Sequence, residues 1–313
     1  MSAEPLQDIV ERILLVPDQH RVYDHDETTA AKVFGIGIPV QSDLLDLGLP
    51  HRVSGGQRYF DELDLANASL ALRTPSPRYL AMRRWPQILR GVVADHAVRY
   101  EVEVAAQCGS KAADHQCDFR LPAEVLALVP GTDPAARRFT LSREVGATGP
   151  AAEASEDLQR VFAEVSAFQF HILPLALYGD LSFLADTSLA NCELSSRYLA
   201  QRATAEGWTA RRSFGLQLFS PYSLQHFWPE VRLDGVWTAF DPFMIHSLVR
   251  WEVLTPGEVS PAQVLNSAVF RIAEEWVDMV LDAGQPARVS LLTRRRAQVG
   301  GADGVTAAEI SRR

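Results

Sequence analysis

The chain has 313 residues, of which 47% are apolar and 22% are charged. That balance predicts a folded globular protein with one large domain or two ordinary ones, and it excludes a disordered chain. The net charge of −9 offers no broad cationic surface to a phosphate backbone, so nucleic acid is not an expected partner. No apolar run is long enough to cross a bilayer and residues 1–21 lack an apolar signal core, so we expect a cytoplasmic protein without membrane association.

The sequence contains three cysteines, Cys108, Cys117 and Cys192. They are too few and too scattered for a disulfide framework, so we expect free thiols, one of which can serve as a nucleophile. Cys108 and Cys117 could bind a metal together with His115, but this set lacks a fourth ligand and does not have a common zinc spacing. The polar run at residues 24–27, near His20, could bind a cation but is interpreted as a solvated loop. No metal or cofactor is therefore expected.

The first half of the chain has the pattern of an α+β region. Helical periodicity covers residues 61–72 and 84–97, and residues 98–106 alternate as a strand does. Two stretches rich in glycine, proline and small residues, 129–134 and 146–155, indicate loops. We therefore expect an N-terminal α+β domain at 1–150 of unknown role, a second domain at 151–293 and a mobile tail at 294–313.

The second half begins with two expected helices. One covers residues 156–177 with Ser155 as its N-cap, and the next is entered near Ser188 or Asn191 and ended by Gly207. Cys192 then lies in the first turn of the second helix. A helix N-terminus favours the thiolate, which is the reactive form of cysteine.

A two-residue turn at 234–235 is expected to join strands at 225–233 and 236–240, because Asp-Gly is a strong hairpin signal. In that register Asp241 falls opposite Trp228. Since side chains alternate between faces, His226 shares the face of Trp228 and lies diagonally across from Asp241, within hydrogen-bond reach. Pro229 cannot donate to the ladder, so an edge strand or a bulge is expected beside His226.

Three stretches of this half resemble the transglutaminase-like superfamily. They are NCELS at 191–195, GWTAR at 207–211, and HFWPEV at 226–231 followed by GVW at 235–237 and DP at 241–242. The superfamily places a cysteine at a helix start, followed by strands that carry a histidine and an aspartate. Asn191 departs from the pattern, because the residue before the cysteine is commonly small.

The resemblance implies a papain-like α+β core at 151–293 that acts without a cofactor. Cys192 would form a thioester, with His226 as its acid and base and Asp241 fixing the imidazole. The oxyanion would be held by the Cys192 N–H and a further donor, for which the candidates are Asn191, Gln225, Trp208 and Trp228.

Several substrates are compatible with such a site. The acyl donor could be a thioester, a peptide or an amide, with a carrier protein as a candidate source, and the acceptor an amine or water. We expect amide formation or acyl transfer in intracellular biosynthesis. The alternatives are a cysteine peptidase or amidase, and an inactive binding protein on the same fold.

Overall fold

The computed structural model describes residues 5–86, 89, 98–109, 117–145 and 154–297. It is an α+β protein whose chain divides into two compact units. The first unit contains residues 1–93, 152–217 and 225–277, and the second contains 94–151, 218–224 and 278–313. This division differs from the expected one, because the first 93 residues belong with the cysteine-bearing half and residues 278–293 do not. No helix within the described ranges is long and apolar enough to span a membrane.

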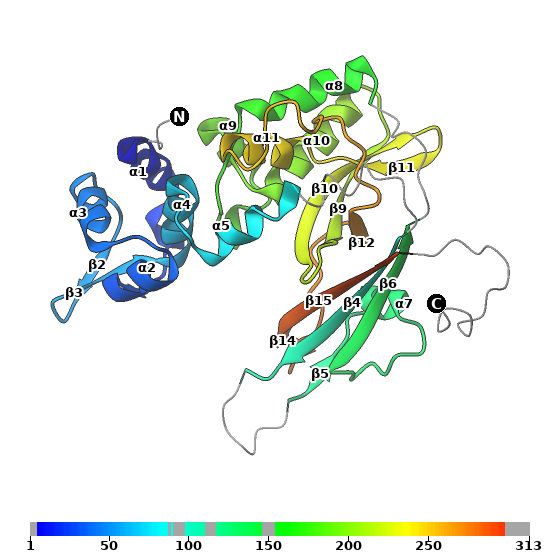
Figure 1. Ribbon diagram of the computed structural model, residues 1–313, viewed down its shortest axis with the longest axis horizontal. Coiled ribbons are helices and arrows are strands. Elements are labelled where there is room, and N and C mark those ends of the chain that lie inside the picture. Colours follow the sequence, from blue (N-terminus) through cyan, green and yellow to red (C-terminus); the bar gives the residue numbers. More distant parts are fainter. Residues whose placement is uncertain (1–4, 87–88, 90–97, 110–116, 146–153, 298–313) are drawn as a thin grey trace, which may run out of the picture. The chain divides into compact units, whose positions relative to one another are not determined.

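The N-terminal part of the first unit combines short helices with a three-stranded sheet (Figure 1). The helices are α1 (Leu6–Leu14), α2 (Glu27–Val33), α3 (Ile38–Asp46), α4 (Glu62–Leu72) and α5 (Pro77–Met82), and the strands, in sheet order, are β1 (Tyr23–Asp26), β3 (Gln57–Asp61) and β2 (Arg52–Ser54). The expected helix at 61–72 is confirmed as α4, capped by the Asp61 carboxylate. The helix expected at 84–97 lies largely outside the described residues.

The remainder of the first unit has four helices around a four-stranded sheet. The helices are α8 (Glu156–Ala163), α9 (Leu181–Thr187), α10 (Cys192–Ala205) and α11 (Pro242–Arg250). The sheet has the order β11 (Val236–Ala239), β10 (Leu224–Leu233), β9 (Ala210–Gln217) and β12 (Val269–Ala273). A short parallel pair, β7 (Gln169–Phe170) and β8 (Leu189–Ala190), precedes α10.

The prediction of one long helix over residues 156–177 is wrong after the first two turns. Ser155 does cap α8, but α8 ends at Ala163 and a 3-10 turn follows at Glu164–Ala167. The Arg250 guanidinium then binds the carbonyls of Ser166 and Phe168, and β7 pairs with β8. These tertiary hydrogen bonds engage backbone groups that a continuous helix would use, so they outweigh the local helical preference.

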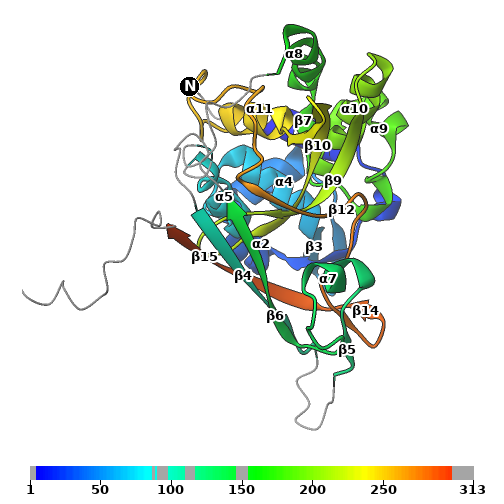
Figure 2. The ribbon, with the colours of Figure 1, turned by 90° about the vertical axis from the view of Figure 1, so that its right-hand side faces the viewer.

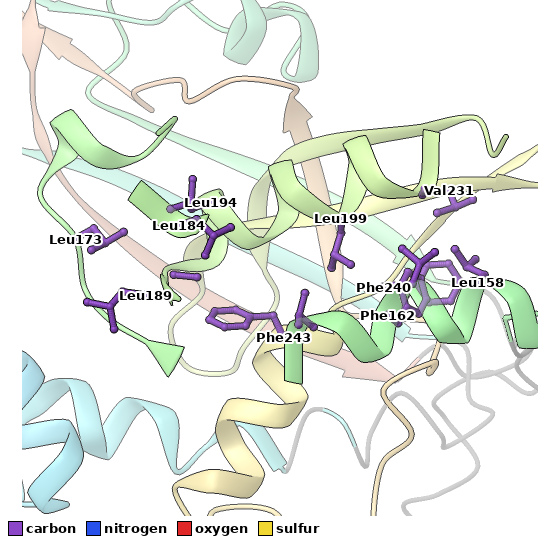
Figure 3. Packing of buried hydrophobic residues seen from close by; sticks show 14 of the residues in the cluster. Leu158, Phe162, Leu173, Leu184, Leu189, Leu194, Leu199, Val231, Phe240 and Phe243 are labelled. Carbon is purple, nitrogen blue, oxygen red and sulfur yellow. The ribbon is translucent and has the colours of Figure 1, made fainter. Parts of the chain in front are cut away.

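A continuous apolar cluster joins α8, α10, α11 and the sheet (Figure 3). Leu194 and Leu199 are buried apolar residues of α10. The rings of Phe162 and Phe240 pack 4.9 Å apart. Full burial of each such side chain contributes about 1.5–3 kcal/mol, so this cluster fixes α10 against the strands that carry the other candidate site residues.

The β10–β11 hairpin has the expected register. Asp234 and Gly235 both have positive φ, 48° and 81°, which is the conformation of a type I′ turn. Leu233 pairs with Val236, and the Phe240 N–H donates to the Pro229 carbonyl at 3.1 Å, which continues the same register. The edge strand expected at Pro229 is wrong, because β10 lies between β11 and β9. The register with β11 is regular from Glu230 to Leu233. Pro229 has no N–H to donate, and this is tolerated because Pro229 lies opposite Phe240, just beyond the end of β11.

The second unit is built on a three-stranded antiparallel sheet, seen side by side in Figure 2, with the order β15 (Arg288–Ala297), β4 (Val98–Gln107) and β6 (Arg138–Val145). A second small sheet has the order β14 (Gln285–Pro286), β13 (Leu281–Asp282) and β5 (Phe119–Arg120), and the helix α7 is Ala123–Leu128. The expected strand at 98–106 is confirmed. Residues 294–297, expected in a mobile tail, belong to β15 and pair with β4.

Candidate active site

Cys192 is the first residue of α10, as the sequence predicts. The Asn191 side chain caps this helix, because its Oδ1 accepts the Leu194 N–H at 2.8 Å. The Cys192 side chain is partly exposed, whereas most of its neighbours in the helix are buried. The thiol is therefore accessible to a substrate and lies at the positive end of the helix dipole, which stabilises a thiolate.

His226 and Asp241 form a buried pair. The Nε2 atom of His226 lies 2.6 Å from Oδ2 of Asp241, and both side chains are 5% exposed. Asp241 follows β11 and is the N-cap of α11, where its Oδ1 accepts the Met244 N–H at 3.1 Å. One carboxylate oxygen thus fixes the helix start while the other orients the imidazole.

The Cys192 thiol interacts with the same imidazole, through its charge and through a hydrogen bond. Burial is the largest influence on the pKa of His226 and lowers it, but the charges and hydrogen bonds of Asp241 and Cys192 together outweigh burial and raise the pKa to about 10. Since Asp241 engages Nε2, Nδ1 is the nitrogen left for the thiol. With this raised pKa, the imidazole of His226 holds its proton at neutral pH.

Two tryptophans enclose the imidazole. Trp228 stacks on His226 with ring centroids 6.3 Å apart and an interplanar angle of 21°, and its Nε1 donates to Glu230 at 3.1 Å. Trp85 meets His226 edge-on at 5.3 Å and 78°. Both indoles are buried, so they limit the access of water to the ion pair. Sequence reasoning missed Trp85, because no local motif connects the N-terminal segment to the hairpin.

A buried ion-pair network supports the start of α10. Glu193, which follows Cys192, is 3% exposed and accepts from Arg197 at 2.9 Å and, still more closely, from Arg212 on β9. Arg212 also pairs with Glu275 and lies over the Phe227 ring. The network therefore joins the helix that carries Cys192 to the sheet that carries His226.

Four residues were expected as candidate donors to the oxyanion, and Asn191 is the one that the geometry favours. Its Oδ1 is engaged in the cap, which leaves the buried Nδ2 as the donor of this side chain. Tyr178 lies nearby: burial and then the charge of Cys192 raise the pKa of this phenol, whereas the charge of Arg78 and a hydrogen bond with the Asn191 side chain lower it. A buried amide donor thus lies one residue before Cys192.

The other three oxyanion candidates are poorly placed. Trp208 follows the C-terminal end of α10, a helix of 14 residues, which puts it roughly 20 Å from Cys192 at 1.5 Å per residue. It packs against the apolar cluster instead. The Trp228 N–H is engaged with Glu230. Gln225 precedes His226 in β10, so its side chain points to the opposite face of the strand.

The remaining cysteines belong to the second unit. Cys108 and Cys117 are partly exposed free thiols. A hydrogen bond that the Cys117 thiol donates to Cys108, followed by burial and the charge of Asp282, raises the pKa of Cys117 to about 12. His115 lies outside the described residues, so the grouping of these three residues is not defined. Within the described ranges, no group of three or more His, Cys, Asp or Glu residues is arranged to hold a metal ion.

Comparison of the sequence with models of known protein families found no match. No curated protein is significantly similar to it. The functional conclusion therefore depends on the geometry of the site.

Proposed function

We propose that this protein is a cysteine-dependent acyl-transfer enzyme in which Cys192 is the nucleophile, His226 the general acid and base, and Asp241 the residue that orients the imidazole. One observation carries the proposal: a single buried imidazole is hydrogen-bonded to a carboxylate at 2.6 Å through Nε2 and to a thiol at the start of a helix. This is the arrangement that activates a cysteine nucleophile.

In the first half of the reaction, the Cys192 thiolate attacks the carbonyl carbon of the acyl donor and forms a carbon–sulfur bond. The resulting oxyanion accepts hydrogen bonds from the Cys192 N–H and from Nδ2 of Asn191. When the tetrahedral intermediate collapses, the bond to the leaving group breaks and His226 supplies its proton. The acyl group is then held as a thioester on Cys192.

In the second half, neutral His226 removes a proton from the acceptor, which attacks the thioester carbonyl and releases the Cys192 thiolate. An amine acceptor gives an amide and water gives an acid, so the same three residues serve both reactions. We favour an amine acceptor and amide formation. Trp85 and Trp228, which enclose His226, limit the water that competes with it.

We also propose that α10 and the β9–β12 sheet form a transglutaminase-like core. The support is the order of the parts: a cysteine at a helix start, then a strand with His226, then Asp241 at the end of the next strand. The sequence contexts NCELS, HFWPEV and DP resemble those of that superfamily, apart from Asn191 before the cysteine and Pro229 in the strand.

The test is capture of the acyl-enzyme by intact-protein mass spectrometry. The protein is incubated with simple thioesters, activated esters and peptide amides, and the adduct is mapped by peptide digestion. We expect an adduct of the acyl mass on Cys192 that is absent in Cys192→Ala and is released on adding amines as the amide. An adduct that persists in Cys192→Ala, or none from any donor class, would contradict the proposal. Release only as the acid would make the protein a hydrolase.

A further inference from the structure

A small cavity lies in the first unit. Its volume is about 210 Å³, and it is lined by residues of α1, α4 and its C-cap, the β7 segment, and the end of α11. None of Cys192, His226 and Asp241 lines it. Pockets for drug-sized ligands measure roughly 300–1,000 Å³, so this cavity suits a smaller molecule, of about the size of an amino acid.

The lining of this cavity is positively charged. Arg12 of α1, Arg73 after α4 and Arg250 of α11 contribute guanidinium groups, and among the described residues that line the cavity none is an aspartate or glutamate. Arg250 is held by the carbonyls of Ser166 and Phe168, and Arg73 is paired with Glu252 outside the lining. Fixed cationic groups around a small hollow favour an anionic ligand.

His171 supplies a polar group that lacks a partner. The residue lines the cavity and is 2% exposed, and its Nε2 has no hydrogen-bond partner within the described part of the chain. Burial first, and then the charges of Arg12 and Arg21, lower the pKa of His171 to about 3. The ring is therefore neutral, and in the Nε2–H tautomer it can donate to an oxygen. A buried polar nitrogen of this kind is costly unless a ligand engages it.

The segments around this cavity are those that hold the candidate catalytic residues. The His171 N–H donates to the Ala190 carbonyl at 2.8 Å, two residues before Cys192. On the other side, Ser247 lines the cavity from α11, which begins at the cap residue Asp241. A ligand here would stabilise the backbone on which both Cys192 and Asp241 are placed.

We propose that this cavity binds the carboxylate group of a small organic molecule, with Arg12 and the Nε2–H of His171 as its principal partners. This site is distinct from the acyl-transfer site and does not depend on the proposed function. The organic part of the ligand packs on the apolar portion of the lining, which includes Ile9, Ile13 and Trp251.

The experiment is titration calorimetry of the full-length protein with a panel of small monocarboxylates, dicarboxylates and amino acids. The uncharged amide of each serves as a control, and chloride and phosphate as inorganic anions. We expect saturable binding of at least one carboxylate and at least tenfold weaker binding of its amide. In ring-labelled protein, the ligand should shift the Nε2 resonance of His171 but not that of His20, which lies outside the lining. Absence of binding across the panel, or equal competition by chloride, would overturn the proposal.

Variants give an independent test. Arg12→Gln, in a partly exposed position of α1, is expected to weaken carboxylate binding at least tenfold. The matched variant Arg160→Gln removes the same charge from α8, where the side chain is 80% exposed, and is expected to leave binding unchanged. His171→Phe keeps the ring volume but removes the nitrogen, and its circular dichroism shows whether it folds. If Arg12→Gln binds as tightly as the wild type, the assignment of the site is wrong.

Discussion

Nε2 of His226 lies 2.6 Å from Oδ2 of Asp241, which follows strand β11 and is the N-cap of helix α11. The same carboxylate caps the helix through its other oxygen. The orientation of the imidazole and the start of α11 therefore depend on one side chain. Two functions of this carboxylate, charge and capping, can be separated by substitution, because asparagine is also a good N-cap residue.

The first prediction concerns the pH dependence of stability. The pKa of His226 is about 10 in the folded protein and about 6.5 in an unfolded chain. The folded state thus binds the proton more tightly, so the stability that this adds is fully present below about pH 6.5 and is lost as the pH rises through 10. Asp241→Asn is expected to reduce this loss while retaining the helix cap. Urea unfolding at pH 6, 8 and 10 measures it, and an identical pH dependence in the two proteins would contradict it.

The second prediction separates the two roles of Asn191. Asn191→Ser keeps a capping oxygen and removes the Nδ2 donor, whereas Asn191→Ala removes both. Both variants are expected to lower kcat by about 10²–10³, the usual effect of losing one oxyanion donor. Only Asn191→Ala is expected to lose a further ~1 kcal/mol in the free energy of unfolding. Steady-state kinetics and urea unfolding test the two effects, and full activity in Asn191→Ser would remove Asn191 from the oxyanion site.

The third prediction concerns close packing behind His226. A Cβ at Gly215 would lie 2.0 Å from the Phe270 carbonyl and 2.9 Å from the Trp228 ring. Gly215→Ala is therefore expected to destabilise the protein by about 1–3 kcal/mol and, by displacing Trp228, to lower activity. Gly179→Ala is the control, because its nearest neighbour, Arg197, lies 3.8 Å away. Equal melting temperatures for the two variants would show that the sheet accommodates the methyl group.

The fourth prediction tests the ion pairs of Glu193, the residue that follows Cys192. Glu193→Gln leaves Arg212, whose side chain is 7% exposed, with a weaker partner. Removal of one member of a buried pair commonly costs about 3–5 kcal/mol. Glu206→Gln breaks an ion pair with Arg202 in the same helix, but Glu206 is 53% exposed, so a loss below about 1 kcal/mol is expected. A small effect in Glu193→Gln would mean that Arg197 and Glu275 suffice to hold Arg212.

Local signals in the sequence were enough to predict that Cys192 lies at a helix start and that His226 pairs with Asp241, whereas the approach of Cys192 to His226 was implied only by the family resemblance. Asn191 is a good N-cap, so the start of α10 could be placed, and Asp234-Gly235 determines the hairpin register that brings His226 close to Asp241. Each of these inferences uses residues close together in the chain, where geometry follows from turn and cap chemistry.

Features that depend on distant segments could not be predicted. The helix expected at 156–177 stops early because Arg250 and strand β8 engage its backbone. Trp85 approaches His226 from a segment without any motif. The pairing of β15 with β4 places the two ends of a long stretch of chain in one sheet, and no local pattern specifies such a contact.

The most direct test of the central claim, a thiolate–imidazolium pair at Cys192 and His226, is the pH dependence of iodoacetamide labelling, followed at each cysteine by mass spectrometry. Cys108 and Cys117 are internal controls, and the pKa of Cys117, raised to about 12, predicts slow labelling there. The account predicts rapid labelling of Cys192 that persists well below the ordinary thiol pKa of about 8.5 and is lost in His226→Ala. Slow labelling of Cys192 until the pH exceeds 8.5, unchanged in His226→Ala, would contradict it.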